Sequence, residues 1–352
     1  MKSKVAEIKK YGQKIWLDNL SRELISSGRL INLITQDEIA GVTSNPSIFH
    51  KAISNDPLYQ DDVKVLKQSN LSLEERYETI VIKDIQNTCD IMAHMYKQTN
   101  GTDGFVSLEV SPHLANNASA TIENARRLWK TINRPNLVIK IPATKAGNIA
   151  LTQLISEGIN INITLLFSLN QVLETWKAYI NGLQIRYSNK QDLCHVKAVA
   201  SFFLSRIDSA IDDKLPKELK GVSAINLAKT AYLAYQDIFT SNIFKELKQY
   251  GANEQFLLFA STGTKNPNYS DVLYVEELIG KDTINTVPDA TLDAFRDHGI
   301  ANNNIIKDIQ NAPKIIEQVN KYINLDQLGE QLQLDGLKLF EQSFDQLITL
   351  MK

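Results

Sequence analysis

One lysine, Lys140, lies in the middle of the strongly apolar run Leu-Val-Ile-Lys-Ile-Pro-Ala at residues 137–143. A charged side chain is costly in such surroundings unless chemistry requires it. Burial favours the neutral form of an amine, and a neutral amine is a nucleophile that can form a Schiff base with a carbonyl substrate. The alternative is a structural lysine that pairs with a buried carboxylate.

The run that carries Lys140 has the pattern of a buried β-strand. It is short and β-branched, with Arg-Pro-Asn before it and Ala-Thr-Lys at its end, which favours a strand over a helix. Side chains alternate along a strand, so Val138, Lys140 and Pro142 share one face. The Lys140 side chain therefore points to the same side of the sheet as Val138 and Pro142.

Polar residues also occur late in other short apolar runs of the chain. If these runs are parallel strands of one barrel, their carboxyl ends meet, and active sites of such barrels are built there. Barrel interiors are normally filled with aliphatic side chains, so this convergence predicts a polar pocket. The residues concerned are Asp18, Thr43, Asn45, Glu109, Asn162, Thr164 and Ser201.

Schiff-base chemistry at Lys140 requires general acids and bases, both to expel water from the carbinolamine and to move a proton when a carbon–carbon bond breaks. Asp18 and Glu109 are the two carboxylates expected to point inward, and different environments can give them different roles. Thr164 with Glu109 can orient the water of imine formation.

Two asparagines, Asn45 and Asn162, are candidates for holding substrate hydroxyls. Structural alternatives stay open for several of these residues. Asp18 can cap the following helix, Glu109 can simply neutralise Lys140, and Asn45 can belong to a turn before proline.

Other cations are candidates for a nucleophile or for phosphate binding. Lys197 is the rival lysine, but its place in its strand puts it deeper, toward the bottom of the barrel, and Lys145 falls beyond its strand. Ser201 and Arg206 combine a hydroxyl with a guanidinium suited to bidentate phosphate contacts. Lys265, in Ser-Thr-Gly-Thr-Lys-Asn-Pro, can supply a second cation.

The short β-rich runs recur eight times with helical segments between them, which is the alternation of a parallel sheet built from βα units. No linker or break in composition separates them, so we expect residues 1–352 to form a single α/β domain, a (β/α)8 TIM-type barrel. The predicted strands are 14–20, 41–45, 104–110, 137–143, 160–167, 195–203, 255–262 and 285–288.

Longer segments with helical periodicity lie between these strands. They cover residues 71–96, 117–132, 170–187, 224–250 and 304–323. Two stretches predict extra helices beyond the minimal barrel, residues 56–67 and the amphipathic C-terminal helix at 325–351. We interpret the apolar stripe of this last helix as a packing surface rather than a lid over the site.

Composition restricts the class of protein. The chain has 352 residues, 43% hydrophobic and 22% charged, with a net charge of -2 and no basic stripe, which disfavours nucleic acid as a partner. Cys89 and Cys194 lie far apart without metal-site spacing. No segment has the pattern of a signal peptide or a membrane span, so we expect a cytoplasmic protein without a membrane partner.

Several of these segments together resemble the transaldolase family. They occur in the family's order and extend over most of the chain. They are Ile-Trp-Leu-Asp-Asn-Leu, Gly-Val-Thr-Ser-Asn-Pro-Ser-Ile-Phe, Ser-Leu-Glu-Val-Ser-Pro, Val-Ile-Lys-Ile-Pro-Ala-Thr, Asn-Ile-Thr-Leu-Leu-Phe-Ser, Ala-Ser-Phe-Phe-Leu-Ser-Arg-Ile-Asp, Ser-Thr-Gly-Thr-Lys-Asn-Pro and Asn-Thr-Val-Pro-Asp-Ala-Thr.

The resemblance implies a barrel that moves a dihydroxyacetone unit between sugar phosphates in the non-oxidative pentose phosphate pathway, with no metal or coenzyme. It matches Lys140 to the Schiff-base lysine, Asp18 to the acid/base of carbon–carbon cleavage, and Glu109 with Thr164 to the water-handling pair. It also matches residues to substrate contacts, namely Asn45, Asn162 and Ser201, with Arg206 as a phosphate-binding arginine.

One position departs from part of the family. Where some members have a second phosphate-binding arginine, this chain resembles the branch with lysine, Lys265. Sugar phosphates are the expected partners, and the expected assembly is a monomer or homodimer. Two alternatives stay open: a Schiff-base aldolase that releases free dihydroxyacetone, and a sugar-phosphate-binding barrel without catalysis.

Overall fold

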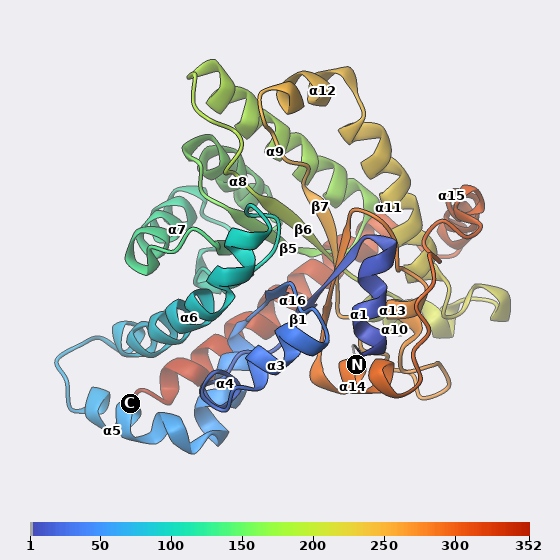
Figure 1. Cartoon of the computed structure of the whole chain (residues 1–352). Helices are drawn as coiled ribbons and strands as arrows, with labels where there is room; N and C mark the ends of the chain where they lie inside the picture. Colours follow the sequence, from blue (N-terminus) through green and yellow to red (C-terminus); the bar gives the residue numbers. More distant parts are fainter. Residues whose placement is uncertain (1–2) are drawn as a thin grey trace.

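The structure is a computed structural model that describes residues 3–352. Eight parallel strands close into one barrel in chain order, from β1 to β8 (Figure 1). The predicted (β/α)8 fold is therefore confirmed. The strands are β1 Gln13–Leu17, β2 Gly41–Val42, β3 Phe105–Glu109, β4 Leu137–Pro142, β5 Ile161–Leu166, β6 Ala198–Phe203, β7 Phe256–Ala260 and β8 Thr283–Val287.

Several predicted strand boundaries are wrong, among them the end of β1, which is Leu17 rather than Leu20. Strand β6 begins at Ala198 rather than at His195, whose side chain is 87% exposed in the preceding loop. Strand β8 begins two residues earlier than predicted, because Thr283 pairs with Gln13 of β1. Strand β2 is only Gly41–Val42, since Asn45 already caps the next helix.

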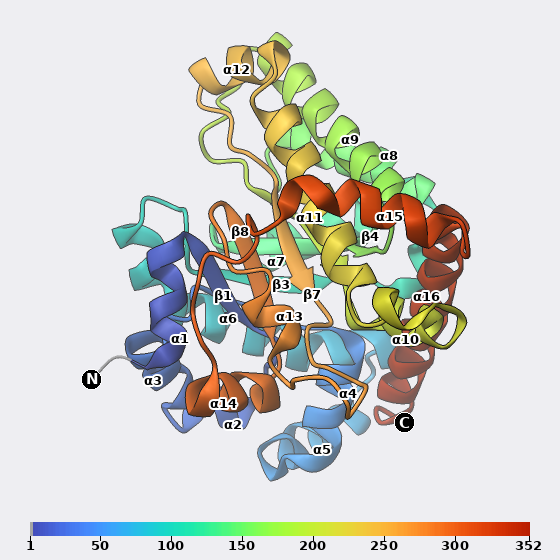
Figure 2. The ribbon, with the colours of Figure 1, turned by 90° about the vertical axis from the view of Figure 1, so that its right-hand side faces the viewer.

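The helices lie around this barrel (Figure 2). They are α1 Lys4–Glu7, α2 Arg22–Ser26, α3 Arg29–Gln36, α4 Pro46–Asn55, α5 Gln60–Lys67, α6 Leu73–Gln98, α7 Ala118–Ile132, α8 Lys145–Glu157, α9 Leu169–Ser188, α10 Ser205–Ile211, α11 Ser223–Phe239, α12 Asn242–Gln249, α13 Leu273–Glu276, α14 Asp289–His298, α15 Ala312–Asn320 and α16 Leu325–Thr349.

Two predicted helical segments differ from the structure. The segment 224–250 is two helices, α11 and α12, because the Ser241 hydroxyl accepts a hydrogen bond from the Phe244 amide and begins a new helix. The segment 304–323 is helical in α15 only from Ala312, after Asp308 in a left-handed conformation with φ of 52°. The two extra helical stretches are confirmed as α5 and α16.

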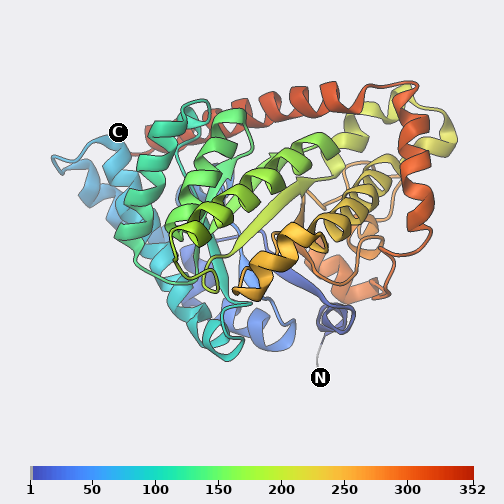
Figure 3. The same cartoon turned by 90° about the horizontal axis from the view of Figure 1, so that it is seen from above.

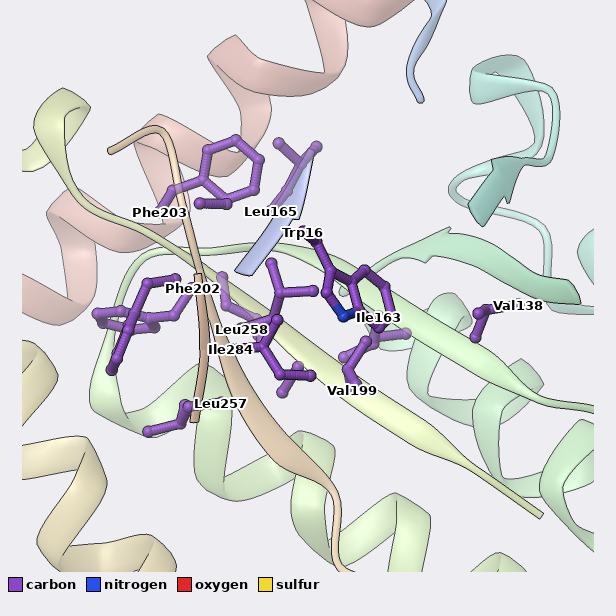
Figure 4. Close-up of a cluster of buried hydrophobic side chains, with 14 of the residues drawn as sticks. Trp16, Val138, Ile163, Leu165, Val199, Phe202, Phe203, Leu257, Leu258 and Ile284 are labelled. Carbon is purple, nitrogen blue, oxygen red and sulfur yellow. The ribbon is translucent and has the colours of Figure 1, made fainter. Parts of the chain in front are cut away.

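The barrel interior is filled near its middle by a layer of apolar side chains. Its members Trp16, Val138, Val199, Leu258 and Ile284 come from five strands, and all are buried. Figure 4 shows Trp16, Val199, Leu258 and Ile284 close together, with Val138 further to one side. Because this layer closes the barrel across its width, the polar side chains above and below it belong to separate ends of the barrel.

Helix α16 runs along one side of the molecule (Figure 3). It packs against α4, α6 and β5, and its buried stripe includes Leu337, Phe340 and Phe344. No helix in the described part of the chain combines the length and hydropathy that crossing a membrane requires.

Candidate active site

A cavity of about 210 Å³ lies at the carboxyl ends of the strands, on the far side of the apolar layer from the strand starts. Seven of the nine predicted site residues line it. They are Asp18, Asn45, Lys140, Thr164, Ser201, Arg206 and Lys265. The other two, Glu109 and Asn162, are the strand neighbours of Lys140 on either side.

Lys140 points into the barrel interior. Its side chain is 6% exposed, and its Nζ atom donates one hydrogen bond of 3.3 Å to the Ser44 carbonyl oxygen. The same nitrogen lies 3.8 Å from the Glu109 carboxylate and 5.7 Å from the centre of the Phe340 ring. The amine is therefore held among protein groups at the edge of a cavity rather than directed toward the outer helices.

Asp18 follows the end of β1 and faces the same cavity. Its carboxylate accepts a hydrogen bond of 2.9 Å from Thr43 Oγ1, and Thr43 Oγ1 is 2.6 Å from Thr286 Oγ1. Burial raises the pKa of Asp18, while the charge of Lys140 and the hydroxyl of Thr43 oppose the shift. The alternative that Asp18 caps the next helix is wrong, because Ser21 caps α2.

Glu109 ends β3 beside Lys140. Neither of its carboxylate oxygens accepts a hydrogen bond from another described residue. Burial raises the pKa of Glu109 to about 7, against the opposing charge of Lys140, with Asp18 adding to the rise. Because the pKa of Glu109 is raised overall, the attraction to the Lys140 charge is smaller than the effect of burial on this carboxylate.

The next strand, β5, places two polar side chains differently. Thr164 lines the cavity, and its buried hydroxyl has no hydrogen-bond partner within residues 3–352. Asn162 lies beside the cavity, where its amide donates to Ser107 Oγ at 3.2 Å and accepts from Ser201 Oγ at 2.7 Å. Asn162 therefore orients Ser201, whereas Thr164 has a hydroxyl left for water or substrate.

Asn45 has a structural task and also lines the cavity. Its side-chain oxygen accepts a hydrogen bond of 3.0 Å from the Ile48 amide and so caps α4. The predicted turn before proline is thus a helix N-terminus, and its capping residue faces the site.

Two cations lie at the outer part of the cavity. The Arg206 guanidinium is 5.4 Å from the centre of the Phe203 ring, and no carboxylate of residues 3–352 pairs with it. Burial lowers the pKa of Arg206. Lys265 is exposed on the loop after β7, at the rim. An unpaired guanidinium near an exposed ammonium suits an anionic group such as phosphate.

The rival lysines lie elsewhere. Lys145 is exposed at the first residue of α8 and does not line the cavity. Lys197 precedes β6 and lines a different cavity at the opposite end of the barrel, which confirms its predicted deep position.

Three groups of this site were not predicted from the sequence. Thr286 was detectable, because alternation along β8 places it on the inner face with Ile284. The Ser44 carbonyl oxygen and Phe340 had no local signal, since a backbone contact and a contact from the distant helix α16 depend on the folded chain. Phe340 also corrects the interpretation of the α16 stripe as packing surface alone.

A lysine that shares the carboxyl ends of the strands of a (β/α)8 barrel with two carboxyl groups of raised pKa defines a class of barrel enzyme with an amine in its active site. Comparison with known proteins identifies the family. Residues 15–351 match the family described as transaldolase/fructose-6-phosphate aldolase, and the chain belongs to this family.

Curated relatives extend the match over nearly the whole chain. A protein of Neisseria gonorrhoeae named transaldolase is 49% identical over 346 residues, which cover 98% of each chain. A transaldolase of Thiobacillus denitrificans is 45% identical over 97% of this chain and 98% of its own. Transaldolase 2 of a Nostoc species is 44% identical over 97% of this chain and 95% of its own.

Proposed function

We propose that this chain transfers a dihydroxyacetone unit from a ketose phosphate to an aldose phosphate through a Schiff base on Lys140. The chain is an enzyme, a transferase with transaldolase function. The observation that supports the role of Lys140 is its Nζ atom, held at the cavity 3.8 Å from one of two carboxyl groups whose pKa values are raised.

Imine formation is the first step. The Lys140 amine attacks the ketose carbonyl carbon, and the carbinolamine then loses its oxygen as water, which requires a proton. Glu109, with a pKa of about 7, can hold that proton near neutral pH, and the free hydroxyl of Thr164 orients the water. The same pair returns water to the imine when the product is released.

Carbon–carbon cleavage is the second step. Asp18 takes the proton of the substrate hydroxyl, the bond between the two carbons breaks, and its electron pair moves into the iminium to give an enamine. Thr43 fixes the orientation of the Asp18 carboxylate. The enamine then attacks the acceptor aldehyde, Asp18 returns the proton, and hydrolysis frees the new ketose.

The outer part of the cavity binds the substrate in this proposal. Arg206 and Lys265 hold the phosphate, and Ser201, oriented by Asn162, contacts a hydroxyl near it. Asn45 contacts the hydroxyls near the imine. The proposal includes the branch of the family: the lysine after β7, Lys265, supports a branch that uses lysine where other members use arginine.

Other expectations extend the proposal to the whole chain. Residues 1–352 act as one domain, a view supported by the contribution of all eight strands to a single barrel. The protein is cytoplasmic and acts as a monomer or homodimer. Sedimentation of the purified protein distinguishes the two assemblies.

A coupled assay tests the function. Fructose 6-phosphate with erythrose 4-phosphate should give sedoheptulose 7-phosphate and glyceraldehyde 3-phosphate, with little turnover when the acceptor is omitted. The family description also includes fructose-6-phosphate aldolase, so the second candidate is an aldolase. Release of free dihydroxyacetone at the same rate without acceptor would support that candidate, and no turnover at all would leave only a binding protein.

A further inference from the structure

A second cavity, of about 580 Å³, lies at the end of the barrel opposite Lys140. Most of its lining residues precede or begin strands, as Lys14 does in β1 and Phe256 in β7, and others belong to the last turns of α11 and to α12. A volume of this size matches those of small-molecule sites in proteins. None of the predicted site residues lines this cavity.

The apolar layer of the barrel separates the two cavities. Trp16, Val138, Val199 and Ile284, side chains labelled in Figure 4, line the second cavity and none of them lines the first. Lys140 lies two residues beyond Val138 on the same face of β4, above this layer. A ligand in one cavity therefore does not reach the reacting groups of the other.

Most charges around the second cavity are already paired. The Lys14 ammonium lies 2.6 Å from Asp103, and Lys248 lies 2.6 Å from Glu254, which also accepts a hydrogen bond from the Tyr235 hydroxyl. At the rim, Lys281 lies 3.7 Å from Asp282. Both carboxylates of the lining thus have cationic partners.

Lys197 is different. Its half-buried ammonium donates to the Asn253 side-chain oxygen, and no carboxylate of residues 3–352 lies within ion-pair distance of it. Burial and the nearby charge of Lys14 lower the pKa of Lys197. A cation that lacks a counter-ion in a partly buried cavity favours an anionic occupant.

Aromatic side chains line the same cavity as this cation. The Trp16 and Phe105 rings stack with centroids 6.2 Å apart and an interplanar angle of 28°, and Phe256 and Phe239 also line the cavity. The buried Trp16 Nε1 has no hydrogen-bond partner among residues 3–352. Aromatic side chains thus line the cavity together with charged and amide side chains, a combination that suits a ligand with both a ring and an anionic group.

We infer that this cavity is a second binding site, for a small organic anion carried on a flat apolar ring, with the anionic group at Lys197 and the ring against Trp16, Phe105 and Phe256. The inference is independent of the transferase function, because the two sites share no residue. A carboxylate and a phosphate ester on the ring have the chemistry that the site requires, and binding assays distinguish them.

Calorimetric titration of the full-length protein tests the site with four probes. The probes are 2-naphthoate, 2-naphthyl phosphate, the uncharged 2-naphthol and the ringless anion acetate. At least one naphthyl anion should bind with a Kd of about 1 mM or tighter, and 2-naphthol and acetate should bind about tenfold more weakly or not at all. The tighter of the two anions identifies the preferred acid group.

Matched variants locate the bound probe. Lys197→Met should weaken naphthyl-anion binding about tenfold or more, while Lys197→Arg, which keeps the charge, and Lys177→Met, on the exposed face of α9, should bind as the wild type does. Lys140→Met should also bind normally, and fructose 6-phosphate should not compete. Circular dichroism verifies the fold of each variant.

Three results would overturn the inference: no binding of either naphthyl anion to the wild type, equal binding by folded Lys197→Met, or competition by fructose 6-phosphate. If Lys197→Met does not fold, a fluorescence measurement of Trp16 quenching takes the place of the binding assay on that variant. The naphthyl anions should then quench a Trp129→Phe/Trp176→Phe variant, which keeps Trp16 alone, and an absence of quenching would contradict the site. Loss of the coupled transferase activity would not affect any of these results.

Discussion

At the scale of single residues, the site combines one amine with two carboxyl groups in different surroundings, the half-buried Asp18 and the buried Glu109. Asp18 has a hydroxyl partner in Thr43, whereas Glu109 has no hydrogen-bond donor among residues 3–352. Burial raises the pKa of both. Carboxyl groups whose environments differ in this way can serve separate proton transfers in one reaction.

Substitution of Asp18 should separate imine formation from carbon–carbon cleavage. Asp18→Ala removes the group that takes the substrate proton, so turnover should fall by about 10²–10⁴-fold while the imine with fructose 6-phosphate still forms. Stopped assays of turnover, together with borohydride trapping of the unbroken ketose, measure the two steps. Asp18→Asn controls for side-chain volume, and near-normal turnover in either variant would exclude the role of Asp18.

Substitution of Glu109 should change the pH dependence of stability. The folded protein keeps the Glu109 proton up to a pKa of about 7, whereas the ordinary value is 4.5. The folded state binds more protons between these values, so the free energy of unfolding contributed by this group falls as pH rises. Between pH 5 and pH 8 the free energy of unfolding should therefore fall by about 2–3 kcal/mol less in Glu109→Gln than in the wild type.

Chemical denaturation of wild type and Glu109→Gln at both pH values measures this effect. Glu246→Gln, on the exposed surface of α12, serves as the matched control and should leave the wild-type profile unchanged. Parallel profiles for wild type and Glu109→Gln would show that the Glu109 proton is not retained in the folded state.

At the scale of elements, helix α16 holds an irregular part of the site. Leu165 in β5 has φ of 63°, and the pairing of β5 with β6 shifts register between Ile163 and Leu166. Gln333 of α16 donates hydrogen bonds of 3.0 Å to the Leu165 and Ala143 carbonyl oxygens. A distant helix thus stabilises the strand distortion next to Thr164.

Removal of the two hydrogen bonds that Gln333 donates should lower both the stability of the protein and its turnover. Gln333→Ala leaves two carbonyl oxygens without their donor, which should cost about 1–3 kcal/mol, and a displaced Thr164 should lower kcat about tenfold. Gln331→Ala, on the exposed face of the same helix, is the matched control. Denaturation and steady-state assays measure both variants, and equal behaviour of the two would show that the Gln333 hydrogen bonds do not support the site.

Local sequence predicts the elements better than it predicts their ends. The apolar runs of β4 and β5 predict those strands clearly. For β6 the predicted strand begins at His195, but the strand in the structure begins at Ala198, because pairing with β5 and β7 decides where β6 begins. The break between α11 and α12 falls at Ser241, a capping residue within otherwise helical periodicity.

At the scale of the whole molecule, the alternation of side chains along each strand decides both which residues form the apolar layer and which residues reach the site. The inner face of β4 carries Val138 in the apolar layer and Lys140 above it, and β1 carries Trp16, with Asp18 directly after the strand end. Site residues on strands were therefore predictable from sequence. Phe340 and Gln333 were not, since they reach the site from a helix more than 150 residues further along the chain.

Barrel closure depends on close packing between β1 and β2. A Cβ atom at Gly41 would lie 2.5 Å from ring atoms of Trp16, the largest side chain of the apolar layer. Gly41→Ala should therefore destabilise the protein by about 1–3 kcal/mol through overpacking.

A double-mutant cycle with Trp16→Leu tests whether contact with the Trp16 ring causes the destabilisation by Gly41→Ala. The smaller leucine leaves room at Gly41, so Gly41→Ala should cost clearly less in the Trp16→Leu background. Denaturant unfolding gives the four free energies. A cost that is the same in both backgrounds would mean that contact with Trp16 does not explain the glycine.

Borohydride trapping with fructose 6-phosphate decides whether Lys140 is the nucleophile. Without an acceptor aldehyde, cleavage leaves a three-carbon unit on the amine, and reduction makes that bond permanent. Mass spectrometry of the digested protein should find the three-carbon adduct on Lys140, and Lys140→Met should give no adduct. An adduct on Lys197 or Lys145, or an unmodified Lys140 in turning-over wild-type enzyme, would contradict the Schiff-base assignment.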